Sequence, residues 1–150
     1  MADDRTFVII GASVAGAKAV EQLRTDGFTG RIVLVGAETE RPYERPPLSK
    51  GYLLGKDPRD KAFVHDASWY AEHNVELVLG VQATALDVKA HVVTLGNVEP
   101  LHYDKLLLTT GSRVRTLDVA VVPQRSSTRF SAYQPSGCTK IDSRSSLPSR

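Results

Sequence analysis

The sequence predicts an α/β domain that begins with a parallel βαβ unit. Residues 6–10 and 31–35 are continuous runs of β-branched and apolar residues, as is typical of strands buried on both faces. Between them a glycine-rich turn leads into residues 14–24, where apolar residues recur every third position, and Gly27 suits the end of a helix. A strand, a crossover helix and a second strand within about 30 residues are the components of a parallel βαβ unit.

The elements that follow are shorter and more mixed. Prolines between residues 40 and 50 exclude a long helix before Leu48, but they leave room for a short one over residues 49–54. The remaining expected elements are a helix over 67–74, a strand over 75–79, a small antiparallel excursion over 82–88 and 91–95 with its turn at Lys89 and Ala90, and a buried strand over 103–108.

The character of the chain changes after about residue 118. Residues 124–150 are rich in Ser, Arg and Pro and lack apolar periodicity, so they cannot bury enough apolar surface to offset the entropy of ordering them. We therefore expect a first domain over residues 1–118 and a disordered C-terminal tail over 119–150. The tail carries five basic residues and one acid, which makes it the source of the net charge of +2. Residues 1–118 are net acidic, so we expect no nucleic-acid partner.

Composition also excludes several kinds of protein. No apolar stretch approaches the roughly 20 residues that cross a bilayer, and residues 2–5 do not resemble a secretory signal, so we expect no membrane partner and a cytoplasmic protein. The single cysteine, Cys138, excludes an internal disulfide. The four histidines lack metal-ligand spacing, so we expect no metal site.

The turn over residues 11–16, Gly-Ala-Ser-Val-Ala-Gly, lies where a dinucleotide-binding fingerprint must lie, between a strand and a helix. Gly11 suits the tight turn, and Gly16 suits close packing of the helix on the strand. Ser13 replaces the middle glycine of the fingerprint, and it is small enough to be tolerated and offers a hydroxyl to a phosphate. The N-terminus of the helix, at Val14, Ala15 and Gly16, is expected to bind the pyrophosphate through backbone N–H groups.

An acidic residue, Glu38, follows the second strand of the unit. A carboxylate at this position accepts hydrogen bonds from both hydroxyls of a ribose and repels a 2′-phosphate. The alternative is a glycine turn of another α/β domain with a solvated glutamate. The fingerprint and Glu38 predict a dinucleotide site, and at this stage NAD and FAD both remain possible.

The segment over residues 41–50, Arg-Pro-Tyr-Glu-Arg-Pro-Pro-Leu-Ser-Lys, resembles the FAD-dependent ferredoxin reductases that serve bacterial cytochrome P450 and dioxygenase systems, the putidaredoxin-reductase type. The resemblance extends from about residue 6 to residue 118 and implies a Rossmann-like FAD-binding domain. It implies that Arg45 and Lys50 lie against the flavin, where Lys50 would be the catalytic residue, because a cation stabilises negative charge on reduced flavin. The alternative for Lys50 is a solvated surface lysine.

Further positions match the same family. The resemblance implies that Ala83 lines the adenine, and that residues 106–113 correspond to the family's "ATG" motif with Thr109 in place of alanine. Thr110 and Gly111 would then pass close to the FAD pyrophosphate. Related disulfide reductases carry a cysteine pair in the 41–50 stretch, which this sequence lacks, so electrons would pass directly from the flavin to an outside acceptor.

The resemblance implies electron transfer from NADH through FAD to a 2Fe–2S ferredoxin. Members of the family continue beyond the position of Asp118 with the rest of the FAD domain, an NAD-binding domain and a C-terminal domain. The sequence after residue 118 does not resemble that continuation, so we expect a truncated form of the FAD-binding domain. Two alternatives remain: a non-catalytic dinucleotide-binding fragment, and a stand-alone NAD-binding module, which residues 45–50 disfavour.

Overall fold

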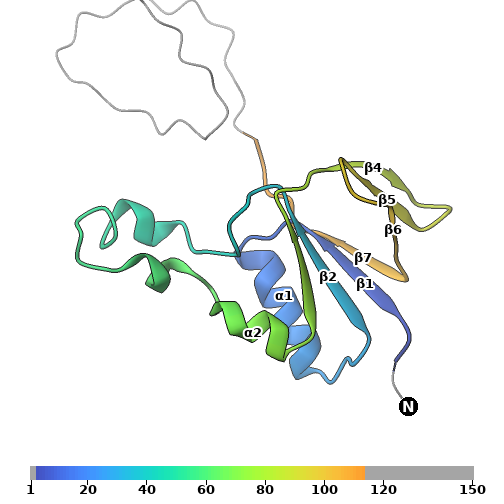
Figure 1. Ribbon diagram of the computed structural model, residues 1–150, viewed down its shortest axis with the longest axis horizontal. Helices are drawn as coiled ribbons and strands as arrows, with labels where there is room; N and C mark the ends of the chain where they lie inside the picture. The colour runs from blue at the N-terminus through green and yellow to red at the C-terminus, as the bar shows by residue number, and fades with distance from the viewer. Residues whose placement is uncertain (1–2, 114–150) are drawn as a thin grey trace, which may run out of the picture. The chain divides into compact units, whose positions relative to one another are not determined.

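A computed structural model describes residues 3–113, which form two β-sheets, two α-helices and two short 3-10 helices (Figure 1). These residues belong to one compact unit, Met1–Val114. The predicted domain boundary at residue 118 and the predicted disordered tail lie outside the described residues.

The first sheet is parallel and has the strand order β3-β2-β1-β7. Its strands are β1 (Thr6–Ile10), β2 (Arg31–Gly36), β3 (Val75–Leu79) and β7 (Lys105–Leu108). Helix α1 (Val14–Thr25) connects β1 to β2, and all three strand pairings are parallel. The predicted βαβ unit is therefore confirmed, with each of its elements within a residue or two of its expected bounds.

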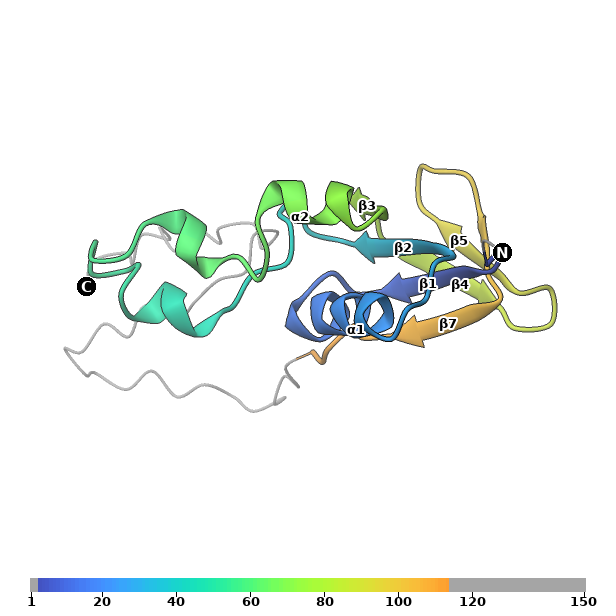
Figure 2. The ribbon, with the colours of Figure 1, turned by 90° about the horizontal axis from the view of Figure 1, so that it is seen from below.

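Both faces of the central strands β1 and β2 are covered, which explains their continuous apolar runs. The buried strand expected over residues 103–108 is wrong in its burial, because β7 lies at the edge of the sheet and its Leu107 and Leu108 are exposed. Alternate residues of β1 and β2 point to opposite faces: Val8 and Val33 join one buried cluster, and Ile9 and Leu34 join the other. The second cluster is completed by α1 and by α2 (Ala67–Glu72), whose Tyr70 is only 2% exposed. In Figure 2 the helix α1 lies in front of the parallel strands, and β4 and β5 lie behind them.

The opposite face is covered by a three-stranded antiparallel sheet, β4 (Ala83–Asp87), β5 (Val92–Leu95) and β6 (Leu101–His102). The turn between β4 and β5 lies where the sequence predicts it. There the Asp87 carboxylate accepts hydrogen bonds from the backbone N–H groups of Lys89 and Ala90, both at 2.9 Å. Strand β6 was not predicted, because two residues are too few to show an alternating pattern.

The segment between β2 and β3 makes a long excursion that contains two 3-10 helices, η1 (Pro46–Ser49) and η2 (Arg59–Ala62). The short helix expected over residues 49–54 is wrong: η1 ends at Ser49, and turns follow it. A proline in the first turn of a helix needs no hydrogen-bond partner, which allows η1 to begin on Pro46. The base of the excursion is closed by an antiparallel bridge between Tyr43 and Phe63.

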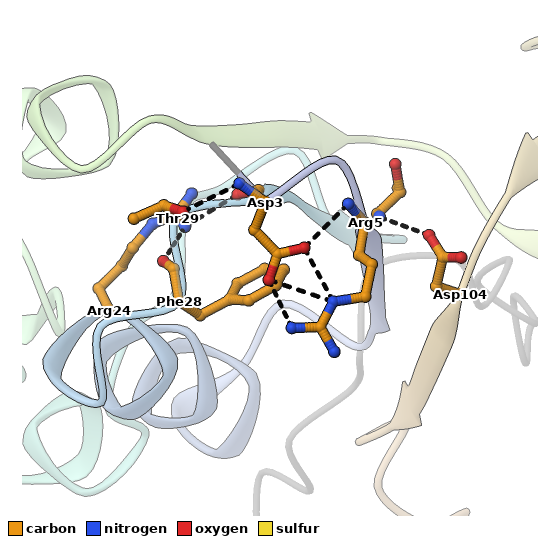
Figure 3. Close-up of polar contacts among 8 residues, drawn as sticks. Asp3, Arg5, Arg24, Phe28, Thr29 and Asp104 are labelled. Carbon is orange, nitrogen blue, oxygen red and sulfur yellow. Dashed lines mark hydrogen bonds and ion pairs between the residues drawn. The ribbon is translucent and has the colours of Figure 1, made fainter. Parts of the chain in front are cut away.

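Arg24, at the end of α1, fixes the amino-terminal end of the sheet (Figure 3). Its guanidinium donates to four backbone carbonyls at 2.6 to 2.9 Å, those of Phe28, Gly30, His73 and Asn74. Burial lowers the pKa of this guanidinium. One side chain thus joins α1 to the loops that precede β2 and β3.

A second set of contacts at this end joins β1 to its neighbours. The Asp104 carboxylate accepts the backbone N–H of Thr6 at 2.7 Å, which ties the start of β1 to the residue before β7 (Figure 3). Asp3 pairs with Arg5, and the rings of Phe7 and Phe28 stack with centroids 4.0 Å apart. The amino-terminal end of the sheet is therefore linked by side chains from several segments.

Two kinds of feature are missing from the described part of the chain. None of the helices in residues 3–113 combines the length and the apolar character that a bilayer crossing requires. Within the same residues no three His, Cys, Asp or Glu side chains gather in a way that could hold a metal ion.

Candidate functional site

A cleft of about 800 Å³ opens at the carboxyl ends of β1, β2 and β7. In the strand order β3-β2-β1-β7, the chain adds β2 and β3 on one side of β1 and later returns to add β7 on the other side, so the strand order reverses at β1. Ligands of open α/β sheets bind at such a reversal. The lining comes from residues 10–13, 35–38, 81–86 and 108–113, together with Arg45, Val93 and Leu106.

The floor of the cleft is the glycine turn after β1. Gly11 has a φ of +119°, and a Cβ on it would lie 2.3 Å from the carbonyl oxygen of Thr109. Its N–H donates to the carbonyl of Val35 at 2.8 Å. Gly16 is buried, and a Cβ there would lie 2.2 Å from the carbonyl oxygen of Gly11. Both positions require glycine, Gly11 for the turn and Gly16 for the packing of α1 on it, as the sequence predicts.

The N-terminus of α1 faces the same turn. Ser13 is the N-cap residue, and its side chain makes no capping hydrogen bond. No acidic residue lies in the first turn of the helix, and Val14 and Ala15 are exposed. The first N–H groups of a helix have no partner within the helix, so this end offers backbone donors, a hydroxyl and a partial positive charge.

Thr109 connects the end of β7 to the glycine turn. Its N–H donates to the carbonyl of Ile10 at 2.8 Å, and its hydroxyl donates to the carbonyl of Gly11 at 2.8 Å and lies 3.2 Å from that of Ile10. Thr110 and Gly111 follow it and line the cleft. Sequence reasoning noted Thr109 only as a replacement for alanine and missed this contact, which depends on the pairing of β7 with β1.

Glu38, just beyond β2, lines the cleft with two donors on its carboxylate. The Tyr43 hydroxyl donates to Oε2 at 2.7 Å, and the Arg45 guanidinium donates to Oε1 at 3.2 Å. The Glu38 side chain remains 55% exposed and that of Arg45 66% exposed. The structure thus brings the two predicted residues Glu38 and Arg45 together, and it adds Tyr43, to which sequence reasoning gave no role.

The other predicted residues lie at different distances from the cleft. Ala83, in β4, lines it together with its neighbours. Gly16 lies beneath the turn, and neither it nor the predicted Val14 and Ala15 line the cleft. Lys50 is exposed in the turns that follow η1 and is not among the lining residues. Its placement near a flavin ring therefore stays a prediction.

Comparisons with known proteins show which family this chain resembles. The profile of the pyridine nucleotide-disulphide oxidoreductase family matches residues 5–142. The ferredoxin–NAD(+) reductase component of the anthranilate 1,2-dioxygenase system of Burkholderia cepacia is 45% identical over 120 residues, which are 77% of this chain and 30% of that protein. Putidaredoxin reductase of Pseudomonas putida is 41% identical over 113 residues, 75% of this chain and 27% of that protein.

Solved structures give the same grouping. The covalent complex of putidaredoxin reductase with putidaredoxin contains a chain that superimposes with a TM-score of 0.74 at 39% identity, over 81% of this chain and 29% of that one. The chain thus spans about three tenths of the length of the proteins it matches. With a family match over most of its residues and a parallel sheet that carries the expected glycine turn, the chain belongs to the pyridine nucleotide-disulphide oxidoreductase family.

Proposed function

We propose that the cleft binds FAD, and that the chain is the FAD-binding part of a cytoplasmic reductase that passes electrons from NADH to a 2Fe–2S ferredoxin. The observation that carries the proposal is the meeting of three features at one cleft. These are a glycine turn at the N-terminus of α1, a carboxylate after β2, and a strand end packed on the turn. Together they supply the groups that the adenosine diphosphate half of a dinucleotide requires.

The residues of the cleft fit this half of FAD. Gly11 lets the end of β7 pack directly on the turn, because a Cβ on it would lie 2.3 Å from the carbonyl oxygen of Thr109, and the adjacent N-terminus of α1 offers backbone donors to a pyrophosphate. Gly11, Ser13, Val14, Ala15 and the first turn of α1 would hold the pyrophosphate, with Thr110 and Gly111 opposite. Glu38 would accept the ribose hydroxyls, and Ala83 would lie along the adenine. A cleft of about 800 Å³ is within the usual range for cofactor sites.

When bound, the flavin supplies the redox chemistry, since it accepts a hydride and can release electrons one at a time. The chain supplies orientation and electrostatics. Arg45 and Lys50 are cations of the same excursion, and we propose that they face the cofactor. Support for the ferredoxin partner comes from the relatives, one of which is a dioxygenase-system ferredoxin–NAD(+) reductase and another of which has been solved with putidaredoxin.

The test is to titrate the purified chain with FAD and, separately, with FMN, and to measure binding by the quenching of flavin fluorescence. FMN lacks the adenosine half that the proposed contacts recognise. We therefore expect FAD to bind at least about 100-fold more tightly, because several hydrogen bonds, each of which contributes about a factor of 3 to 10, are lost together. Equal affinity for FAD and FMN, or no binding of either, would contradict the proposal.

A turnover assay separates the reductase from the alternative. NADH-dependent reduction of an artificial acceptor by the FAD-loaded chain would support the reductase. FAD binding without such turnover would favour a non-catalytic dinucleotide-binding fragment, a possibility consistent with the three tenths of its relatives that this chain spans.

A further inference from the structure

The carboxylate of Glu38 is held from outside the cleft by Tyr43. The phenol hydroxyl of Tyr43 donates to Oε2 at 2.7 Å, whereas Tyr43 itself does not line the cleft. Arg45 does line the cleft and reaches the other oxygen, Oε1, at 3.2 Å. Each carboxylate oxygen therefore has one protein donor, and the shorter bond comes from the residue that does not line the cleft.

This arrangement leaves acceptor capacity of a defined kind. An ionised carboxylate has about four lone-pair positions, two on each oxygen. With one position on each oxygen occupied by Tyr43 and Arg45, one on each remains. A ribose presents two adjacent hydroxyls, each of which can donate to one of these oxygens. The carboxylate is thus arranged for a vicinal diol.

The backbone of Tyr43 is held by hydrogen bonds, so its side chain can hold the Glu38 carboxylate in one orientation. Tyr43 forms a bridge with Phe63, and a backbone hydrogen bond lies on each side of it. On one side the N–H of Glu44 donates to the carbonyl of Ala62 at 2.7 Å, and on the other the N–H of Val64 donates to the carbonyl of Pro42 at 3.0 Å. This short ladder anchors the segment that carries Tyr43 to the returning part of the excursion. The guanidinium of Arg45, in contrast, belongs to a side chain that is 66% exposed.

A cation, Arg41, also contacts this ladder through Phe63. The guanidinium of Arg41 lies 3.6 Å from the centroid of the Phe63 ring, and the neighbouring Pro42 is fully buried. A cation over an aromatic face is an attractive contact, which further restrains Phe63, the bridge partner of Tyr43. The Tyr43 hydroxyl therefore reaches the Glu38 carboxylate from a segment held by backbone hydrogen bonds, whereas the other donor to this carboxylate is the exposed Arg45.

From this geometry we propose that Tyr43 is a positioning residue for ribose recognition: it fixes the Glu38 carboxylate so that the two oxygens accept the 2′- and 3′-hydroxyls of the adenosine ribose. The inference rests on the proposed binding of FAD in this cleft. It goes beyond that function in assigning a role to a residue outside the cleft.

The test is a thermodynamic cycle with the full chain. The affinities of the wild type and of Tyr43→Phe are measured for ADP and for 2′,3′-dideoxy-ADP, in each case by competition with FAD. Tyr43→Phe keeps the ring and the backbone ladder and removes only the hydroxyl. We expect this substitution to lower the affinity for ADP about 3- to 10-fold, the usual contribution of one hydrogen bond, and to leave the affinity for 2′,3′-dideoxy-ADP unchanged. Tyr52→Phe is the matched control, because Tyr52 is 42% exposed and lies in the turns after η1.

The outcomes are distinct. If wild type binds neither FAD nor ADP, the proposed function itself fails. If wild type binds both but Tyr43→Phe leaves the ADP affinity at the wild-type value, the positioning role alone is overturned. Equal weakening of ADP and 2′,3′-dideoxy-ADP would also overturn it, because a purely structural effect does not depend on the ribose hydroxyls. Circular dichroism and thermal melting of each variant monitor the fold.

Discussion

The two ends of the parallel sheet differ in the groups that hold them together: side chains at the amino-terminal end and mainly backbone groups at the carboxyl end. At the amino-terminal end Arg24 alone donates to four backbone carbonyls, and Asp104 and Arg5 add further side-chain contacts (Figure 3). At the carboxyl end the turn after β1 has no large side chain, and its close contacts are between backbone groups and the Thr109 hydroxyl.

The comparison shows how one sheet serves two purposes. Side chains that satisfy loop carbonyls at one end stabilise the domain without occupying the other end. Glycine at the opposite end leaves helix donors exposed to a ligand at a cost in backbone entropy. Stability and binding should therefore respond to different substitutions at the two ends.

The largest effect on stability is expected at Arg24. Arg24→Met removes the donors of four carbonyls, in three part-buried contacts and one exposed contact, so we expect a loss of about 2–4 kcal/mol in the free energy of unfolding. Affinity for FAD should change little, because Arg24 lies at the other end of the sheet. Urea denaturation followed by circular dichroism measures the first quantity, and FAD titration measures the second.

Arg31→Met is the control for this substitution. Arg31 pairs with Glu76 at 2.7 Å, but both side chains are about half exposed, and such surface pairs contribute about 0–1 kcal/mol. Equal destabilisation by Arg24→Met and Arg31→Met would show that the four carbonyl contacts add nothing beyond an ordinary surface arginine.

Gly11 provides the next test, at the carboxyl end. Gly11→Ala places a Cβ against the Thr109 carbonyl at a φ of +119°. The turn must then shift, at a cost of about 1–3 kcal/mol in stability. We expect affinity for FAD to fall at least about tenfold, because the backbone donors move with the turn.

Gly27→Ala separates strain from lost binding. Gly27 also has a positive φ, +82°, but nothing lies within 4 Å of the added Cβ. It should cost about 1 kcal/mol of stability through strain alone and leave FAD affinity unchanged. A parallel loss of FAD affinity in both variants would mean that the site responds to general destabilisation rather than to the shape of the turn.

The smallest expected effect is a pH dependence of stability that comes from His65, which lies at neither end of the sheet but beside the helices. His65 stacks on Trp69, and its Nε2 lies 3.3 Å from a carboxylate oxygen of Glu21. Burial lowers the pKa of His65 and outweighs Glu21, which raises it, while Lys18 and His73 lower it further. A lowered pKa means that protonation disfavours the folded state, so stability should be full above the ordinary histidine pKa of about 6.5 and decrease below it.

Urea midpoints at pH 7.5 and 5.5 test this expectation. His65→Gln should reduce the difference between the two midpoints, and the exposed His102→Gln should not. A wild-type chain that is more stable at pH 5.5 than at 7.5 would show instead that the ion pair with Glu21 outweighs burial.

Much of the fold follows from local patterns in the sequence. The continuous apolar runs predict β1 and β2, and Gly11, Gly16 and Glu38 fall where the βαβ unit places them. These features are predictable because each depends on residues close together in the chain or on a fixed position at the end of a strand.

The parts that were missed depend on contacts between distant residues. The bond from Tyr43 to Glu38 requires the ladder that Tyr43 forms with Phe63, twenty residues later, and no local pattern indicates it. The contact of Thr109 with Gly11 requires the pairing of β7 with β1. Prolines in the excursion remove the periodicity from which its turns could be inferred.

The hydroxyl bond between Thr109 and Gly11 joins residues 98 positions apart. The β1–α1–β2 unit can assemble from local sequence, whereas the wall contributed by β7 forms only after nearly the whole described chain has been synthesised and its ends have met. Closure of that loop is thus the step that completes the cleft. A ligand that binds only the completed cleft would stabilise the pairing of β1 with β7, so the proposed cofactor would raise the stability of the domain.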